Sequence, residues 1–301
     1  MRRWLDAASG ALAHVADRPT LWVPGALAWV ASVGWIPFAA AVVRPPMQSE
    51  LTYFGAGMQT SGLWPLNVVL IAAGVVLFVT LAVGLVAVAN AALDAAVAER
   101  PFEAADAGRR FVISLVGVLP VALVVFALLL ALIAVAPAEF NRPQADPGPL
   151  VRTIGRLVPL LVIGVVIMVV AVALAGLAGR AAAASRSVAG GIVGLPHALR
   201  RAGLTGVLHV AVTAIIGVAF LVLSGTLLAV LWAPISAGLL AGGSIDATGG
   251  LLLIGFVAIW LCLVLAGGAL HAWGSVTWSA LLLRRAPAPR PGHPQEAPIE
   301  R

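Results

Sequence analysis

The sequence has little charge. Only 10% of its 301 residues are Asp, Glu, Lys or Arg, whereas 61% are apolar. A typical soluble domain carries about 25% charged residues and about 45–50% apolar residues. The composition therefore argues against a soluble enzyme, a disordered chain and a disulfide-stapled secreted domain. It is typical of a membrane protein that crosses the bilayer several times.

The sequence also lacks lysine, and it contains a single cysteine. Cys262 has no second cysteine with which to form an intrachain disulfide. All 18 basic residues are arginines, and they lie at the ends of apolar runs. Nucleic-acid binding would need a basic stripe with interleaved aromatic residues. We therefore expect no nucleic-acid partner.

Six apolar runs are long enough to cross a bilayer. About 20 mostly apolar helical residues span a hydrocarbon core of about 30 Å. None of the six runs contains Asp, Glu or Arg in its interior, as the cost of an unpaired charge in hydrocarbon requires. The sequence thus predicts an all-α, polytopic integral membrane protein. The six expected spans are residues 20–43, 66–89, 111–136, 157–179, 207–233 and 251–270.

The arginines distinguish the two ends of these predicted spans. Fourteen of the 18 lie in the two termini and in the second and fourth loops, and four lie in the first and third loops. Cytoplasmic flanks of membrane proteins collect positive charge. The pattern predicts that both termini are cytoplasmic. We expect a multi-pass protein of the inner (cytoplasmic) cell membrane, with the lipid bilayer as its immediate partner.

The sequence divides into three parts. Residues 1–19 are predicted to form an amphipathic helix that lies on the inner leaflet and ends at Pro19. Residues 20–285 form the predicted six-helix transmembrane domain. Residues 286–301 are rich in proline and are predicted to be a disordered cytoplasmic tail. The apolar face of the first segment consists of Trp4, Leu5, Ala8, Leu12 and Val15.

One internal similarity indicates a possible duplication of a helical hairpin. Residues 66–110 align with residues 157–201 without a gap, and the pattern Ala-x-Arg-Arg at 107–110 falls on the same pattern at 198–201. Both copies keep the same orientation, as in a parallel repeat. The alternative is a chance alignment of two apolar helices of biased composition.

Small residues repeat every four positions in the second and fourth predicted spans. Helices in lipid associate through close backbone approach, which small side chains permit. We therefore expect these two stripes to lie at helix contacts, although alanine is abundant throughout the chain. The stripes are Ala87, Ala91 and Ala95, and Ala171, Ala175 and Gly179.

Side chains suited to catalysis are scarce. The sequence contains no His-Glu-x-x-His pair, no glycine-rich phosphate loop with lysine, and no paired carboxylates on one helix face. Ser224, beside Gly225, is the nearest approach to an intramembrane nucleophile, but no base is predicted at its depth. We expect no catalytic residue, no metal ion and no cofactor.

Two histidines are candidates for an intramembrane polar site. His209 and His271 lie toward the cytoplasmic halves of the last two helices. If these helices pack together, the two imidazoles could share a proton, a metal ion or a lipid headgroup, and ionisable residues in a membrane are functional candidates by default. The alternative is that each neutral imidazole bonds to a neighbouring helix and does no more. Two histidines alone are too few for a closed metal site.

Asp94 lies near the cytoplasmic end of the second predicted span. We favour a solvated surface carboxylate; the alternative is an ion pair with Arg186, or with Arg180, that would tie the second and fourth loops together. Two further arginine pairs are candidates for contacts with anionic lipid headgroups, although the topology rule alone explains them. These arginines are Arg109, Arg110, Arg200 and Arg201.

Two stretches carry a resemblance to a known group of proteins. The segment AALDAAVAERPFEAADAGRRFVISLVGVLP resembles the second-loop region of the membrane domains that precede some glycerophosphodiester phosphodiesterases, and GGIVGLPHALRRAGLTG is similar to a second copy of that feature. The resemblance covers residues 66–234 and extends to uncharacterised bacterial six-span membrane proteins. It implies an envelope role close to lipids. No phosphodiesterase domain is attached, so no active-site residue carries over.

Three classes of function fit these observations. We favour a non-enzymatic scaffold, assembly factor or subunit of a membrane complex, partnered by another membrane protein or by a second copy of the chain. A small-molecule or lipid permease would need a polar cavity near the bilayer midplane. A lipid-modifying enzyme would need His209, His271 and Asp94 around a headgroup-sized pocket.

Overall fold

A computed structural model of the chain describes residues 2–43, 64–140, 149–240 and 247–282. The described residues are almost entirely helical and include no strand. Six helical segments are long and apolar enough to cross a membrane, which confirms the predicted all-α membrane fold. The predicted tail, residues 286–301, lies outside the described residues. The six segments are Pro19–Val42, Ala73–Val97, Ala104–Leu128, Val151–Ser185, Val188–Leu239 and Ala247–Leu282.

The first span is not one regular helix. The amphipathic helix α1 (Arg2–Asp17) ends just before Pro19, as predicted, and a 3-10 turn, η1 (Pro19–Leu21), leads into α2 (Trp22–Trp29). A π-helical turn, η2 (Val30–Gly34), then separates α2 from α3 (Trp35–Val42). Such wide turns frequently mark functional or strained positions in helices.

The other five spans lie in longer helices. They are α5 (Trp64–Val97), α6 (Ala104–Phe140), α7 (Pro149–Ser185), α8 (Val188–Leu240) and α9 (Ala247–Leu282). Within α8, Gly203 has φ +52° and ψ −147°, so the chain bends there and residues 188–202 form a separate helical arm. Val188 and Leu195 of this arm pack against Ala178 and Ala182 of α7 and against Ile113 of α6.

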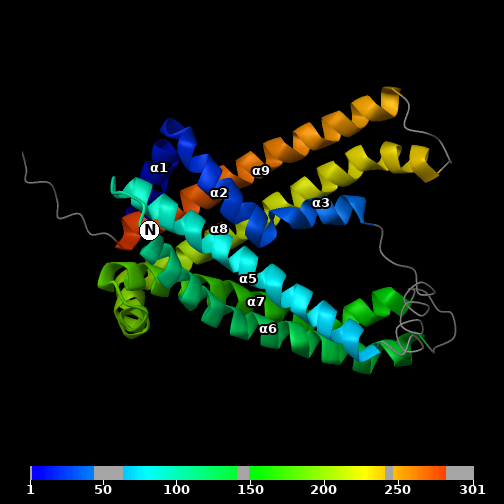
Figure 1. Ribbon diagram of the computed structural model, residues 1–301, viewed down its shortest axis with the longest axis horizontal. Coiled ribbons are helices and arrows are strands. Elements are labelled where there is room, and N and C mark those ends of the chain that lie inside the picture. The colour runs from blue at the N-terminus through cyan, green and yellow to red at the C-terminus, as the bar shows by residue number, and fades with distance from the viewer. Residues whose placement is uncertain (1, 44–63, 141–148, 241–246, 283–301) are drawn as a thin grey trace, which may run out of the picture.

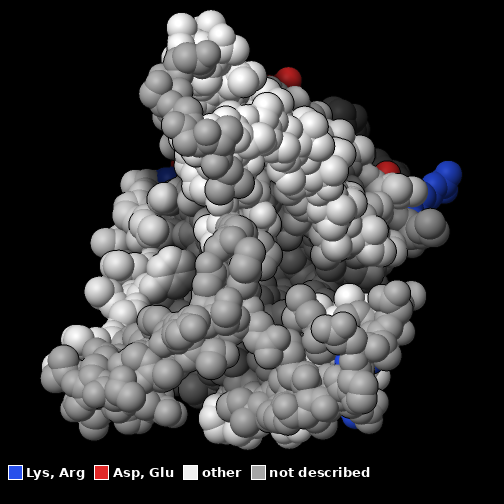
Figure 2. Space-filling view, turned by 90° about the vertical axis from the view of Figure 1, so that its right-hand side faces the viewer, with Lys and Arg blue, Asp and Glu red and all other residues white. Residues whose placement is uncertain are grey.

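The helices form two groups that meet at one end of the molecule. In Figure 1, α5, α6 and α7 form one group, whereas α2, α3, α8 and α9 form the other; the two groups diverge toward the opposite end. The joined end contains α1, the last turns of α5, α7 and α9, and the first turns of α6 and α8. Because most of the described arginines lie here, we call it the arginine-rich end. Figure 2 looks onto the opposite end, where uncharged residues dominate among the described atoms.

Small residues set the closest helix contacts. Ala87, Ala91 and Ala95 are buried in α5, which confirms the first predicted stripe as a packing surface. In the second stripe, a Cβ on Gly117 of α6 would lie only 2.8 Å from Ala175 Cβ. Gly179 of α7 likewise approaches the side chain of Arg110 on α6. Both stripes therefore bring helices together, as expected for packing in lipid.

The tightest contact joins the first span to the last. Gly25 of α2 faces Gly268 of α9 so closely that a Cβ at either position would overlap backbone atoms of the other helix. Next to this crossing, the indole of Trp29 lies between Gly34 and Gly267, and neither position leaves room for a side chain. Glycine at these positions fixes α9 against α2, and the same face of α9 meets α5 and α7 further along the helix, through Ser275 and Ser279.

Helix α1 packs against protein as well as facing outward. Its residues Ala11 and Val15 form a core cluster with Ala272 and Val276 of α9, while Leu5 and Leu12 remain exposed. Three hydrogen bonds of 2.9 Å hold α1 in place. Trp273 Nε1 donates to the Ala8 carbonyl, Trp22 Nε1 to the Val15 carbonyl, and the Arg3 guanidinium to the Leu281 carbonyl. One side of its predicted lipid-facing surface is thus buried within the protein.

The two proposed repeat copies share an order of elements but differ in detail. In the first copy, the chain leaves the helix after Val97 and re-enters it at Ala104. In the second copy, the break is only two residues long, and the following helix bends at Gly203. The duplication stays a prediction.

Candidate functional site

The most polar site in the described structure is a row of buried side chains on α9. His271, Ser275 and Ser279 are four residues apart and therefore lie on one face of the helix. Each of the three bonds to a different polar residue on α5 or α7. Together with Arg110 of α6 they form what we call the polar seam, at the arginine-rich end. Its seven residues are Asn90, Asp94, Arg110, Arg180, His271, Ser275 and Ser279.

Asp94 is the centre of the polar seam. Arg110 Nη2 donates to its Oδ2 atom at 2.7 Å, and Ser279 Oγ donates to its Oδ1 atom at 2.7 Å. Arg180 Nε lies 3.5 Å from the same Oδ2 atom. The Asp94 side chain is only 10% exposed, and a buried carboxylate of this kind is stable only when it is paired and hydrogen-bonded. One carboxylate thus connects α5 to α6, α7 and α9.

Arg180 extends the polar seam from α7 to α9. Its Nη2 atom donates to Ser275 Oγ at 2.8 Å and to the Ser275 carbonyl at 3.3 Å. One turn closer to the membrane centre, His271 Nε2 lies 3.1 Å from Asn90 Oδ1, which joins α9 to α5 a second time. Asn90 and Asp94 are four residues apart on α5, so the two helices meet along matching polar rows.

A second carboxylate lies beside the polar seam, in the first turn of α6. Asp106 is buried and accepts from Arg100 Nη2 at 2.7 Å and from Arg109. Arg109 immediately precedes Arg110 in the sequence, so the Asp106 group and the Asp94 group are neighbours. An acidic residue in the first turn also interacts favourably with the positive end of the α6 helix dipole.

His209 lies on the other side of α9. Its imidazole is fully buried; Nε2 is 3.1 Å from the Gly274 carbonyl, and Trp4 Nε1 donates to Nδ1 at 3.4 Å. Because a carbonyl can only accept, Nε2 carries the hydrogen, and Nδ1 is free to accept from the indole. These partners assign a neutral imidazole with both nitrogens occupied. The ring also meets Trp278 edge to face, with centroids 4.9 Å apart.

The predicted candidates are only partly brought together. His209 bonds to the backbone of α9, whereas His271 bonds from α9 to Asn90 of α5, which matches the alternative of separate bonds to neighbouring helices. The predicted ion pair of Asp94 with Arg186 is wrong, and so is the solvated carboxylate, whereas the alternative partner Arg180 is confirmed: Asp94 contacts Arg110 and Arg180. Arg186 is exposed in the turn after α7, with φ +53°. Arg180, at the last turns of α7, lies at the depth of Asp94, and Arg186 lies beyond the helix end.

The four predicted headgroup arginines have different environments. Arg110 is committed to Asp94, and its buried position is incompatible with direct headgroup contact. Arg109 bonds to Asp106 and is partly exposed. Arg200 is exposed on the helical arm of α8, and Arg201 is half-buried with an Nε atom that has no partner in the described part of the chain.

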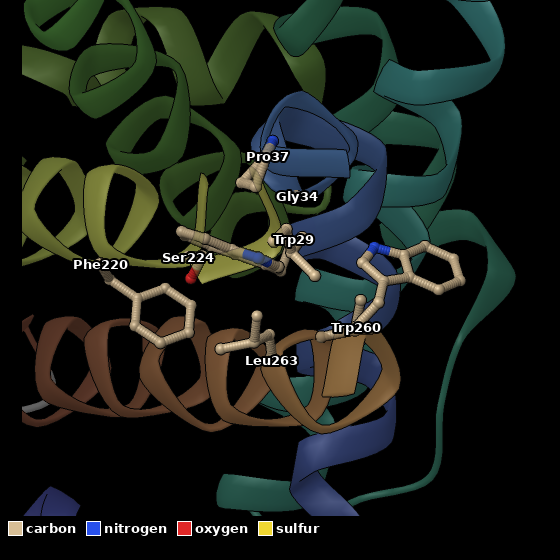
Figure 3. Close-up of a pocket in the computed structure, with 9 residues that line it drawn as sticks. Trp29, Gly34, Pro37, Phe220, Ser224, Trp260 and Leu263 are labelled. Carbon is tan, nitrogen blue, oxygen red and sulfur yellow. The ribbon is translucent and has the colours of Figure 1, made fainter. Parts of the chain in front are cut away.

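A small cavity lies between α2, α3, α8 and α9. Its volume is about 10 Å³, which accommodates roughly one water molecule. Figure 3 shows Trp29 at its centre, with Phe220 on one side and Trp260 on the other. Ser224 Oγ and Trp260 Nε1 are both buried there without a partner among the described residues. Ser224 has no acid or base lining the cavity with it, so this arrangement cannot activate a serine nucleophile.

Among the described residues, no three of His, Cys, Asp or Glu come together as metal ligands would. Comparisons with protein families, with characterised proteins and with solved structures find no significant match. The resemblance to the membrane domain of glycerophosphodiester phosphodiesterases therefore stays a prediction. The polar seam has to be interpreted from its own geometry.

The sequence pointed to Asp94 and His271, but it did not point to three of the polar side chains that join them in the seam. Asn90, Ser275 and Ser279 complete the polar seam. The signal that could have found them is the four-residue spacing of polar side chains, at 90 and 94 on α5 and at 271, 275 and 279 on α9. Polar rows of this kind in apolar helices mark faces that are directed at other helices.

Proposed function

We propose that the chain is a non-enzymatic integral membrane protein, which acts as a scaffold, assembly factor or subunit of a membrane complex close to lipids. The observation that carries this proposal is that the polar groups of the seam bond to one another across helices. Asp94, Arg180 and His271 each bond to a side chain of another helix, so the seam fastens four helices to one another. Groups used in this way hold a shape and are not presented to a substrate.

The other two classes of function find less support in the described residues. A permease would need a solute-sized polar cavity near the midplane, and the cavity beside the π-helical turn accommodates only a water molecule. A lipid-modifying enzyme would need His209, His271 and Asp94 around one pocket, yet each already has its own protein partner: His209 the Gly274 carbonyl, His271 the Asn90 side chain and Asp94 the Ser279 hydroxyl. The positions of the arginines support cytoplasmic termini, which would place the polar seam on the cytoplasmic side of an inner membrane.

Replacing the charges of the polar seam by apolar side chains tests the proposal. A buried ion network can often be exchanged for apolar residues of similar volume without loss of stability, whereas removing one partner alone is strongly destabilising, by about 3–5 kcal/mol. The variant carries Asp94→Leu, Arg110→Met and Arg180→Met together. We expect it to accumulate in the membrane and to restore growth to a strain that lacks the chain. The single variant Asp94→Leu should accumulate poorly.

Proton transfer or substrate chemistry at the polar seam predicts the opposite result. In that case the triple variant accumulates normally and fails to restore growth, which would overturn the proposal. If the triple variant does not accumulate, the pair Asp94→Asn and Arg180→Met serves instead, because it preserves the net charge of the network. The same two readouts then decide.

A scaffold or subunit must also be found in an assembly. At its native expression level, the chain should migrate in native gels as a discrete species larger than the chain alone in the same detergent. Co-expression of two differently tagged copies separates a homo-oligomer from a complex with another protein. Migration only as a monomer in mild detergent and after cross-linking in intact membranes would contradict the proposal.

A further inference from the structure

At the arginine-rich end, four arginines gather around two buried carboxylates. Each of two aspartates accepts from or contacts two guanidinium groups, so these ion pairs leave an excess of two positive charges among the described residues of the group. We call these six residues the guanidinium cluster. They are Asp94 with Arg110 and Arg180, and Asp106 with Arg100 and Arg109.

Among the described residues, the two glutamates between α5 and α6 do not complete the charge balance of the cluster. Glu99 is paired with Arg18 at 3.1 Å, and both side chains are exposed. Glu103 is exposed, and its carbonyl accepts from the backbone at the start of α6. An ion that is held out of water without a partner is disfavoured by several kcal/mol. The surplus charge of the cluster therefore favours an anion supplied from outside the chain.

The cluster lies at the ends of the apolar spans, the level at which lipid phosphates are expected. Asp94 is three residues before the end of α5, and Asp106 is in the first turn of α6, so both lie at the edge of the apolar spans. Lipid headgroups occupy the zone just outside the hydrocarbon core. Arg100 is 33% exposed and Arg109 17% exposed, whereas Arg110 and Arg180 are more deeply buried. The accessible edge of the cluster is thus formed by Arg100 and Arg109.

The geometry of this edge suits an oxyanion. Asp106 accepts from both Arg100 and Arg109, and it therefore holds the two guanidinium groups side by side. Arg109 Nε is buried and has no partner in the described part of the chain. Planar guanidinium groups prefer phosphate and carboxylate oxygens as acceptors and bind them with two donors at once.

We propose that Arg100 and Arg109 form a phosphate-binding site, with Asp106 as the residue that positions them. The phosphodiester of an anionic phospholipid and a free phosphate monoester share the required chemistry. The inference goes beyond the proposed function, because a scaffold can hold its shape with or without this ligand. It concerns Asp106 and its partners and does not depend on how the polar seam responds to substitution.

The test compares two variants with the same net charge. The triple variant Arg100→Gln, Asp106→Asn and Arg109→Gln removes the site and lowers the net charge by one. Arg18→Gln lowers the net charge by one at the same end of the molecule, outside the cluster. The full-length protein and both variants are purified and placed in nanodiscs of phosphatidylcholine alone or with phosphatidylglycerol. Bound phosphatidylglycerol is counted by native mass spectrometry, and thermal unfolding is recorded in parallel.

We expect the full-length protein to retain phosphatidylglycerol and to unfold at a higher temperature in its presence. The triple variant should bind this lipid at least about tenfold more weakly, since hydrogen bonds to a charged group contribute about 1.5–3 kcal/mol. Arg18→Gln should behave as the unsubstituted protein. Equal losses in both variants would show that only net charge matters, and would overturn the proposal.

A second arm identifies the source of the phosphate. The protein in neutral detergent is titrated with glycerol phosphate and with inorganic phosphate, and unfolding is followed in the same way. One outcome is that the soluble phosphates stabilise the unsubstituted protein but not the triple variant, while neither protein prefers phosphatidylglycerol. That result supports the site, with a soluble phosphate as its ligand. No response of the full-length protein to either the lipid or the soluble phosphates overturns it. If the triple variant unfolds during purification, Arg100→Gln alone is used, because it leaves the Arg109 to Asp106 pair intact.

Discussion

Replacement of Gly268 by alanine tests how closely α2 and α9 have to approach. A Cβ at residue 268 would lie 2.5 Å from the backbone nitrogen of Ala26, 2.6 Å from the carbonyl oxygen of Trp22 and 2.7 Å from Ala26 Cα. Ordinary Cβ contacts lie at 3.4–4 Å. All three partners are backbone atoms, which no change of rotamer can move. The two helices must therefore separate by roughly 1 Å, a gap that forfeits about a quarter to a half of the contact attraction.

The magnitude follows from two opposing effects. Overpacking of a tight interface costs about 1–3 kcal/mol, and replacing glycine by alanine within a helix returns about 1 kcal/mol. We expect Gly268→Ala to lower the free energy of unfolding by up to about 2 kcal/mol, or the Tm by up to roughly 8 °C. Gly255→Ala is the matched control on the same helix, because no atom lies within 4 Å of its Cβ position. The control should be as stable as the unsubstituted protein or slightly more stable.

The assay is the fraction of purified protein that remains monodisperse in detergent after heating, measured by size exclusion over a temperature series. The separation between the two curves is the informative quantity, since both substitutions carry the same gain in helix propensity. If Gly268→Ala unfolds at the same temperature as Gly255→Ala, then α2 and α9 are not in close backbone contact. The placement of the α9 polar row against α5 would then lose its physical basis.

Three further predictions concern the rest of the arginine-rich end. His209→Leu leaves the Gly274 carbonyl and the Trp4 N–H without partners, so we expect a loss of about 2–4 kcal/mol and faster proteolysis within α1; an equally protected α1 would contradict the assigned contacts. Gly203→Ala should lower stability by about 1–2 kcal/mol, because a positive φ strains any residue with a Cβ and no other atom lies within 4 Å; Gly217→Ala, also without near neighbours, should show no such loss in the same melting assay. Green fluorescent protein fused to either terminus should fluoresce, and alkaline phosphatase fused to either terminus should be inactive. An active phosphatase at either end would refute the predicted orientation.

The phosphate site and the polar seam make separable claims about one region. Exchange of the seam charges for apolar residues leaves Asp106 and its two arginines in place, and removal of the Asp106 group leaves Asp94 and its partners in place. The two sets of variants can therefore distinguish a scaffold that binds no phosphate from a phosphate-binding protein in which Asp94 has a chemical role. The two sets of variants should be measured side by side in the same membranes.

The sequence alone was sufficient for the number of spans and the extent of α1. These properties depend on transfer of each segment from water to hydrocarbon, which is a local sum over neighbouring residues. Proline at position 19 likewise marks the end of α1 through its own backbone geometry. For the same reason the amphipathic pattern of α1 was visible before any contact was known.

Only the tertiary structure decided which helices are neighbours and which side chains meet. Lipid tails are as apolar as a protein interior, so hydropathy does not reveal which face of a membrane helix is directed inward. The choice of Arg180 over Arg186 for Asp94 depends on the packing of α7 beside α5 and α6, and the separation of the two histidines depends on the rotation of α9. That rotation is fixed by the contact of Gly25 with Gly268, between residues that are 243 positions apart in the chain.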